Sequence, residues 1–351
     1  MRESARARLA TGTVIPAIPL VLDQNRKFDE NGQRRLVRYY LAAGAGGIAV
    51  AVHTTQFAIR NPEIGLYQPV LQTTADEVAR YEKRTGKTII KVAGVCGTQP
   101  QALREAAIAA GLGFDAVLLS PSGLPDLSEA EMLERTRAVA SLLPVIGFYL
   151  QPAAGGRLFS FAYWQGLCAV ENVVAIKAAP FNRYQTLEVL RAVALSGRSD
   201  QIALYTGNDD HIFLDLLTDH VFEEDGQEYR VRFVGGLLGQ WAVWTKRAVD
   251  LFNQLQADRA QGLATAAWLT LASQLTDCNG AIFDAGHKFQ GSIAGIHEIL
   301  RRQGLLAGIW TLDPTETLSP GQAAELDRIQ RQYPHLNDDA FVRDFLAAER
   351  A

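Results

Sequence analysis

The sequence predicts a (β/α)₈ barrel followed by a helical extension. Apolar runs typical of buried strands alternate with amphipathic segments typical of helices, eight times over and at a spacing of roughly 30 residues. No glycine occurs in 23–26, directly after the first predicted strand, where an open dinucleotide-binding sheet normally has a glycine-rich turn. The strand pattern ends near residue 258. We therefore expect residues 1–258 to form the barrel and residues 259–351 to form helices packed on it.

Each strand and helix is predicted from the spacing of its apolar residues. The strands, which are short and apolar, are expected over 13–22, 47–53, 88–94, 116–120, 145–150, 173–177, 202–206 and 231–235. The helices, which are amphipathic, are expected over 31–43, 74–85, 100–110, 128–142, 161–170, 184–195, 210–218 and 241–256, and then over 260–276, 292–303, 321–332 and 338–348. Ser128 and Glu131 have the spacing of a capping box. The acidic segment 223–228 is expected to be a solvated hairpin or loop.

Composition excludes several classes of function. The chain of 351 residues is 48% hydrophobic and 21% charged, as in ordinary globular proteins. A net charge of −4 argues against nucleic acid or an anionic membrane as the main partner. No apolar stretch approaches a membrane span or a secretory signal. Three cysteines, Cys96, Cys168 and Cys278, are too far apart for a disulfide or metal pattern, which favours a cytoplasmic location.

Lys177 is the most informative residue because it ends the apolar run 172–177. A lysine at the end of a buried strand loses solvation of its ammonium group, so its pKa falls and the neutral amine becomes accessible near pH 7. A neutral amine is what a Schiff-base nucleophile requires. The alternative is a strand-end lysine whose amine reaches water or pairs with a carboxylate.

Active-site residues of such barrels come from the carboxyl ends of the strands. Tyr149 ends the strand before that of Lys177, so we expect the phenol beside the amine, where it would move protons. Otherwise Tyr149 is a rim residue with a bound hydroxyl group. Thr54 and Thr55 follow the second strand and offer hydroxyl and backbone N–H groups to a small carboxylate.

These residues stand in segments that resemble one family, namely GTVIPAIPLVLD, GGIAVAVHTTQF, VIGFYLQPAAGG, VVAIKAAP and LYTGNDD. The chain resembles, over nearly its whole length, the dihydrodipicolinate synthase / N-acetylneuraminate lyase superfamily of pyruvate-dependent class I aldolases. The resemblance implies a Schiff base on Lys177 and proton transfer by Tyr149. It also implies that Thr54 and Thr55 hold the substrate carboxylate and that the Leu238 carbonyl borders the site.

The departures from the family pattern bear on the substrate. His53 and Gln56 stand where the family has glycines around the threonine pair, so His53 is a candidate hydrogen-bond donor or acid–base group beside the carboxylate. Pro121, Ser122 and Gly123 stand where the synthases have Pro-Tyr-Tyr, so the tyrosine that crosses a dimer interface there is absent. Ala154 replaces the arginine that receives the second substrate of the synthases. We therefore do not expect dihydrodipicolinate synthase activity. Arg157 lies close enough along the chain to substitute for that arginine.

Gly207 and Asp209 follow the seventh predicted strand. The lyases of this superfamily place acidic residues after the corresponding glycine to hold a polyol tail, so the resemblance implies that both residues bind substrate. A carboxylate accepts hydrogen bonds from hydroxyl groups, which fits a polyhydroxylated substrate. The alternative is that Asn208 and Asp209 only form the N-cap of the next helix.

The sequence therefore predicts a Schiff-base lyase or aldolase that acts on a 2-keto acid such as pyruvate or a sugar-derived keto acid, with an aldehyde as the second partner. One alternative is a Schiff-base dehydratase or hydratase-aldolase of a sugar acid or aromatic substrate, and another is a non-catalytic barrel that binds a keto acid. We expect no metal and no organic cofactor, because a lysine Schiff base needs neither. The family commonly forms tetramers, so the resemblance implies a homo-oligomer, a dimer or tetramer.

Overall fold

The computed structural model describes residues 1–263 and 265–350, which form two compact units. The first unit combines Met1–Thr13 with Ile90–Leu237. The second combines Val14–Ile89 with the described residues from Leu238 onward. Residue 264, inside the helix predicted over 260–276, and residue 351 lie outside the described residues.

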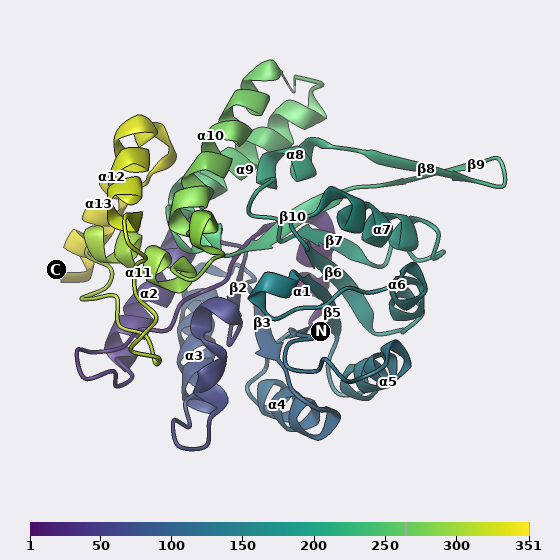
Figure 1. Cartoon of the computed structure of the whole chain (residues 1–351), viewed down its shortest axis with the longest axis horizontal. Coiled ribbons are helices and arrows are strands. Elements are labelled where there is room, and N and C mark those ends of the chain that lie inside the picture. Colours follow the sequence, from purple (N-terminus) through teal and green to yellow (C-terminus); the bar gives the residue numbers. More distant parts are fainter. Residues whose placement is uncertain (264, 351) are drawn as a thin grey trace. The chain divides into compact units, whose positions relative to one another are not determined.

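The first unit contains a run of parallel strands, each connected to the next through a helix or a longer excursion (Figure 1). The strands pair in chain order and are β3 (Ile90–Val95), β4 (Ala116–Leu119), β5 (Val145–Leu150), β6 (Val173–Ala179), β7 (Ala203–Thr206) and β10 (Phe233–Leu238). The helices are α4 (Gln99–Gly111), α5 (Glu129–Ala140), the 3₁₀ turn η3 (Pro152–Ala154), α6 (Phe161–Cys168), α7 (Arg183–Ala194) and α8 (Ile212–Leu217). The capping box of Ser128 and Glu131 is confirmed at the start of α5.

The acidic insert forms an antiparallel hairpin of β8 (His220–Glu224) and β9 (Gln227–Val231), which extends as a two-stranded arm in Figure 1. Its turn places Asp225 and Gly226 at positive φ. The prediction of a strand over 231–235 is therefore wrong at both ends, because Val231 belongs to the hairpin and the last barrel strand runs from Phe233 to Leu238.

An N-terminal helix, α1 (Glu3–Thr11), is absent from the sequence prediction. Its apolar pattern is weak, since only Ala5 and Leu9 are buried. Tertiary contacts hold it in the first unit: Arg2 pairs with the buried carboxylate of Asp115, and the Leu9 carbonyl accepts a hydrogen bond from the Tyr205 hydroxyl group at 2.9 Å. Intrinsic helix propensity is a weak predictor where tertiary contacts of this kind determine whether a helix forms.

The second unit begins with β1 (Val14–Pro16) and β2 (Gly47–Val50), which are joined by a parallel bridge from Ala17 to Ala49. The first strand is shorter than predicted because Pro16 and Pro19 lack the N–H that a strand ladder needs. The helices are α2 (Glu30–Ala43), η1 (His53–Thr55), η2 (Phe57–Arg60), α3 (Tyr67–Thr85), η4 (Gln240–Ala242) and α9 (Thr245–Ala260).

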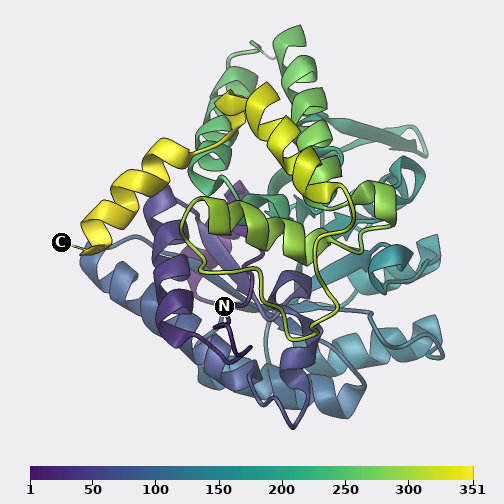
Figure 2. The ribbon, with the colours of Figure 1, turned by 60° about the vertical axis from the view of Figure 1, so that its left-hand side comes forward.

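Helices alone make up the C-terminal part of the second unit, as predicted. They are α10 (Ala266–Ile282), η5 (Ala285–His287), α11 (Ser292–Arg302), α12 (Gln322–Gln332), η6 (Pro334–Leu336) and α13 (Asp339–Arg350). The helix predicted over 260–276 is displaced, because α9 continues to Ala260 and α10 starts at Ala266. Figure 2 shows α13 next to α2, an arrangement that an ion pair between Arg38 and Glu349 supports.

Eight parallel strands, β1–β7 and β10, alternate with helices, which confirms the predicted (β/α)₈ barrel with C-terminal helices. The domain division at residue 258 stays a prediction. No helix in the described parts of the chain combines the length and the apolar character that crossing a bilayer requires.

Asp338 is a buried carboxylate directly before α13 that connects this helix to α2, to α9 and to the end of α11 in the second unit. It accepts hydrogen bonds from the Tyr39 hydroxyl group at 2.6 Å, the Gln303 amide at 2.8 Å and the Lys246 backbone N–H at 2.9 Å. We expect Asp338→Ala to lower the free energy of unfolding by about 3 kcal/mol, because three donors lose their acceptor. Denaturant unfolding measures this effect. Asp344→Ala, which removes an exposed carboxylate within α13, should change the free energy of unfolding by less than about 0.5 kcal/mol. Equal effects of the two substitutions would contradict the role of Asp338.

Candidate active site

Lys177 lies in β6 with two strand residues after it, and its side chain is only 8% exposed. Its register partners are Phe148 in β5 and Tyr205 in β7. The Nζ atom lies 4.5 Å from the centroid of the Phe148 ring, and a Cβ atom on Gly207 would come within 2.4 Å of the Lys177 Cε atom. Lys177 therefore occupies a close-packed position within the first unit, as the prediction of a buried amine requires.

Burial lowers the pKa of Lys177 to about 8, while the nearby negative charge of Asp209 acts in the opposite direction and raises it. At pH 7 roughly a tenth of such amines are neutral, compared with fewer than about one in a thousand for an ordinary lysine. The local environment therefore increases the share of the neutral form of the amine, which is the nucleophilic form.

The structure does not place Tyr149 beside Lys177. Tyr149 pairs with Ala178, and Phe148 pairs with Lys177, because the register of β5 and β6 shifts by one residue between Val145 and Ile146. Since successive side chains of a strand point to opposite faces, Tyr149 lies on the face opposite Lys177. The expectation that the phenol stands next to the amine is therefore wrong.

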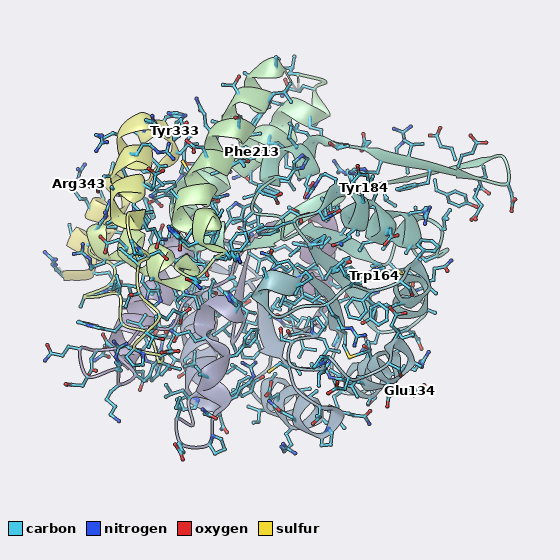
Figure 3. All side chains as sticks on the ribbon, viewed as in Figure 1. Glu134, Trp164, Tyr184, Phe213, Tyr333 and Arg343 are labelled. Atoms are coloured by element: carbon cyan, nitrogen blue, oxygen red, sulfur yellow. The ribbon has the colours of Figure 1, made fainter. Side chains whose placement is uncertain are left out.

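The phenol of Tyr149 is instead packed against the helix layer. Its ring centroid lies 4.9 Å from that of Trp164 on α6, which is labelled in Figure 3, and 6.1 Å from that of Phe159. Burial raises the pKa of Tyr149 to about 12, although a backbone hydrogen bond with Phe159 partly counters this. A phenol with so high a pKa in such surroundings is a poor acid–base group near pH 7.

Gly207 is the predicted site residue that lies against Lys177, and Asp209 follows it by two residues. The Gly207 N–H donates to the Ala178 carbonyl at 2.7 Å, which keeps Gly207 against β6 one residue past the end of β7. The Asp209 N–H then donates to the Gly207 carbonyl at 3.1 Å, and the Asp209 side chain is 9% exposed. A glycine at position 207 is required by space, because a side chain there would overlap Lys177.

Asn208 and Asp215 hold this loop, and sequence reasoning missed Asp215. Asn208 is fully buried; its amide donates to the Asp215 carboxylate at 3.0 Å, and its carbonyl oxygen accepts the Phe181 N–H at 3.1 Å. The N-cap of α8 is His211, so the alternative of an Asn208–Asp209 cap is wrong. The spacing of seven residues from Asn208 to Asp215 is no recognisable motif, which is why only the folded loop reveals the pair.

Asp215 is buried and has several hydrogen-bond partners. It accepts hydrogen bonds from Thr206 at 2.6 Å, from Arg183 at 2.6 Å and from Asn208, and His211 Nδ1 lies 3.0 Å away. Burial alone would raise the pKa of Asp215, but the hydrogen bonds and the charge of Arg183 outweigh it and lower the pKa. Asp215 is therefore a fixed anion that orders the loop after β7.

The remaining predicted site residues lie in the second unit. The Thr54 hydroxyl group donates to the Ala17 carbonyl at 2.7 Å, and the Thr55 hydroxyl group donates to the Ile18 carbonyl at 2.7 Å. The threonine pair is thus anchored to the segment after β1, and its hydroxyl protons are engaged with the backbone.

His53 and Leu238 also lie in the second unit. The His53 ring lies 6.0 Å from that of Phe57, centroid to centroid. The Leu238 carbonyl accepts the Ala17 N–H at 3.0 Å, so one of its lone pairs serves the strand ladder. Among the described residues, no three His, Cys, Asp or Glu side chains are arranged to hold a metal ion.

Comparison with known proteins decides the family. The family model for the dihydrodipicolinate synthetase family matches residues 10–218, more than half of the chain. The chain belongs to the dihydrodipicolinate synthetase family. A curated relative, N-acetylneuraminate lyase from Citrobacter koseri, is 28% identical over 202 residues, a match that covers 56% of this chain and 62% of the lyase.

Solved structures show the fold of this dihydrodipicolinate synthetase family member. Dihydrodipicolinate synthase from Oceanobacillus iheyensis superposes with a TM-score of 0.73 at 20% identity, covering 94% of this chain and 98% of that one. N-acetylneuraminate lyase from Fusobacterium nucleatum, solved with pyruvate, superposes with a TM-score of 0.71 at 16% identity, covering 93% and 98%. At these identities the similarity establishes the (β/α)₈ fold.

Proposed function

We propose that this protein is a class I lyase whose Lys177 forms a Schiff base with a 2-keto acid. The observation that carries the proposal is the burial of Lys177, which lowers its pKa to about 8 within the strand β6. Family membership supports it, because the names of the family and of the curated relative denote a synthase and a lyase.

The chemistry follows from the neutral amine. The Nζ atom attacks the keto carbon, and the carbinolamine that forms loses water to give an iminium ion. In a larger keto acid with a hydroxyl group on C4, the iminium at C2 accepts the electron pair of the C3–C4 bond. As the C4 hydroxyl group gives its proton to a base, that bond breaks and leaves an enamine together with an aldehyde. Protonation of the enamine and hydrolysis then release the keto acid and the free lysine. The reverse sequence joins the two fragments.

We propose that the substrate is pyruvate or a larger 2-keto acid that contains a pyruvyl unit. Two solved structures with this fold, the lyase from F. nucleatum and a prophage protein from E. coli K12, were determined with pyruvate. The roles of Thr54, Thr55 and Leu238 at the substrate, and that of His53 as a nearby donor, stay predictions from the resemblance. Ala154 in place of the family arginine argues against dihydrodipicolinate synthesis.

Two further expectations belong to this proposal. The first is a homo-oligomer, which light scattering of the purified protein measures directly. The second is a cytoplasmic location. Neither the dehydratase nor the non-catalytic alternative is favoured by a particular contact in the described residues.

Incubation with pyruvate and borohydride tests the proposed function. We expect the peptide that contains Lys177 to gain the mass of a reduced pyruvyl group. We also expect the initial trapping rate to rise between about pH 6 and about pH 9 with a midpoint near 8, because deprotonation of a lysine with a lowered pKa increases the neutral fraction as the pH rises. Absence of an adduct with pyruvate and with larger 2-keto acids would favour the non-catalytic alternative.

A further inference from the structure

We propose that the arm formed by β8 and β9 associates with the same arm of a second copy of this chain. The arm contains the acidic insert of the sequence, and it has no part in the proposed Schiff-base reaction. In Figure 1 it projects from the first unit as a separate sheet of two strands. A two-stranded hairpin is only marginally stable by itself in water, so an arm of this kind gains stability from a partner.

Strand pairing assigns the side chains of the arm to two faces, and the first face is turned toward the barrel. Phe222 pairs with Tyr229, and His220 pairs with Val231. Because side chains alternate along each strand, these four residues share one face. All four are buried or half-buried, and the His220 ring lies 6.5 Å from the ring of Phe233 in β10, centroid to centroid. This face is therefore already in contact with its own chain.

The opposite face of the arm is exposed to solvent. It carries two register pairs, Val221 with Arg230 and Glu223 with Glu228. All four residues are exposed, and Val221 is 45% exposed although it is apolar. The first pair lies nearer the barrel and the second nearer the turn. The exposed face thus has a cation and an apolar side chain toward its base and two carboxylates toward its tip.

The charges at the tip favour a cationic partner. Glu223 and Glu228 lie directly opposite each other, and like charges in this arrangement destabilise a strand pair. Glu224 and Asp225 add two negative charges at the turn. The Arg230 guanidinium lies 2.8 Å from the Glu228 carboxylate, but both side chains are more than half exposed, so this ion pair contributes little. Arg230 can therefore exchange this partner for another with little loss of stability.

The base of the arm supplies the cations that the tip requires. A cavity of about 500 Å³ lies there, and its lining includes Arg6 of α1, Arg230 and Arg232. Asp200 and Asp219 also line this cavity, so the arginines exceed the aspartates by one. Arg6 is exposed. The base is therefore positively charged where the tip is negatively charged.

A twofold axis brings these two ends together. When two arms lie face to face and antiparallel, the tip of each arm meets the base of the other. Each strand has five residues, so both arms are about 17 Å long and their charged ends coincide. Glu223 and Glu228 then face the partner's Arg230, and Val221 is covered close to the axis. One surface thus complements itself, as an interface between identical copies requires.

Light scattering of the purified full-length protein tests this association. We expect the wild-type protein to have the mass of at least two chains and a Glu223→Lys/Glu228→Lys variant to have half of the wild-type mass, because its tip repels the base of the partner. An Arg6→Glu/Arg230→Glu variant should also have half of that mass. An equal mixture of the two variants should recover the wild-type mass, because each tip then meets a base of opposite charge. Unfolded variants would not recover it.

Glu134→Lys/Glu171→Lys is the matched control, since it makes the same charge change at two exposed carboxylates of the first unit and should keep the wild-type mass. The association of the arms is wrong if the wild-type protein is a single chain at every concentration. It is also wrong if the two arm variants keep the wild-type mass, or if their mixture does not recover it. Borohydride trapping with pyruvate reports on the proposed function alone, so the two proposals stand or fail separately.

Discussion

Replacing Lys177 with methionine is expected to abolish adduct formation with pyruvate and to lower turnover by roughly 10⁴-fold or more, because no other group supplies the covalent electron sink. Methionine has nearly the length of the lysine stem and is apolar, so it suits a position bounded by Phe148 and Gly207. The folded structure should therefore persist while the chemistry is lost. Mass spectrometry after borohydride treatment and a turnover assay measure the two effects.

Lys91 provides a closely matched control for this experiment. It is a lysine in β3 of the same unit, 9% exposed, with its Nζ atom 6.0 Å from the centroid of the Phe114 ring. We expect Lys91→Met to retain the adduct and the turnover within a few fold. If Lys177→Met still turned over substrate, or if the adduct moved to another lysine, Lys177 would not be the nucleophile.

Gly207→Ala is expected to produce the second large effect. An added methyl group would stand 2.4 Å from the Lys177 Cε atom and 2.7 Å from the Ala179 Cβ atom, so the lysine must move by about 1 Å to restore ordinary contact. A displacement of this size costs about 10²-fold in rate, and the overpacking costs about 1–3 kcal/mol of stability. The trapping rate with pyruvate and the melting temperature should therefore fall together.

Gly111→Ala is the control for this substitution. Nothing lies within 4 Å of the position that a methyl group on Gly111 would take, and its φ is not positive. We expect Gly111→Ala to change neither the trapping rate nor the melting temperature appreciably. A wild-type trapping rate in Gly207→Ala would show that the lysine side chain does not use the space beside residue 207, which would remove the geometric basis of the proposed site.

The expectation for Tyr149 shows where sequence reasoning reaches its limit. Tyr149 and Lys177 end neighbouring strands, and their separation along the chain equals that of Val145 and Val173, which do pair. The register shift after Val145 changes the partner of Lys177 to Phe148. Such an irregularity depends on how two strands twist and pack against each other, and no residue in either strand indicates it.

Several features were determined by the sequence by itself: the eightfold alternation of strands and helices, the helical C-terminal part, and a lysine within an apolar strand. Each of these depends on the local spacing of apolar residues, which indicates the type of element and the side chains that it buries. The tertiary structure alone decided which face of β5 Tyr149 occupies, that Gly207 lies against Lys177, and that Asp215 holds the loop after β7. The reason is that side chains alternate along a strand, so a shift of one residue exchanges the two faces, and contacts across loops leave no periodic signal.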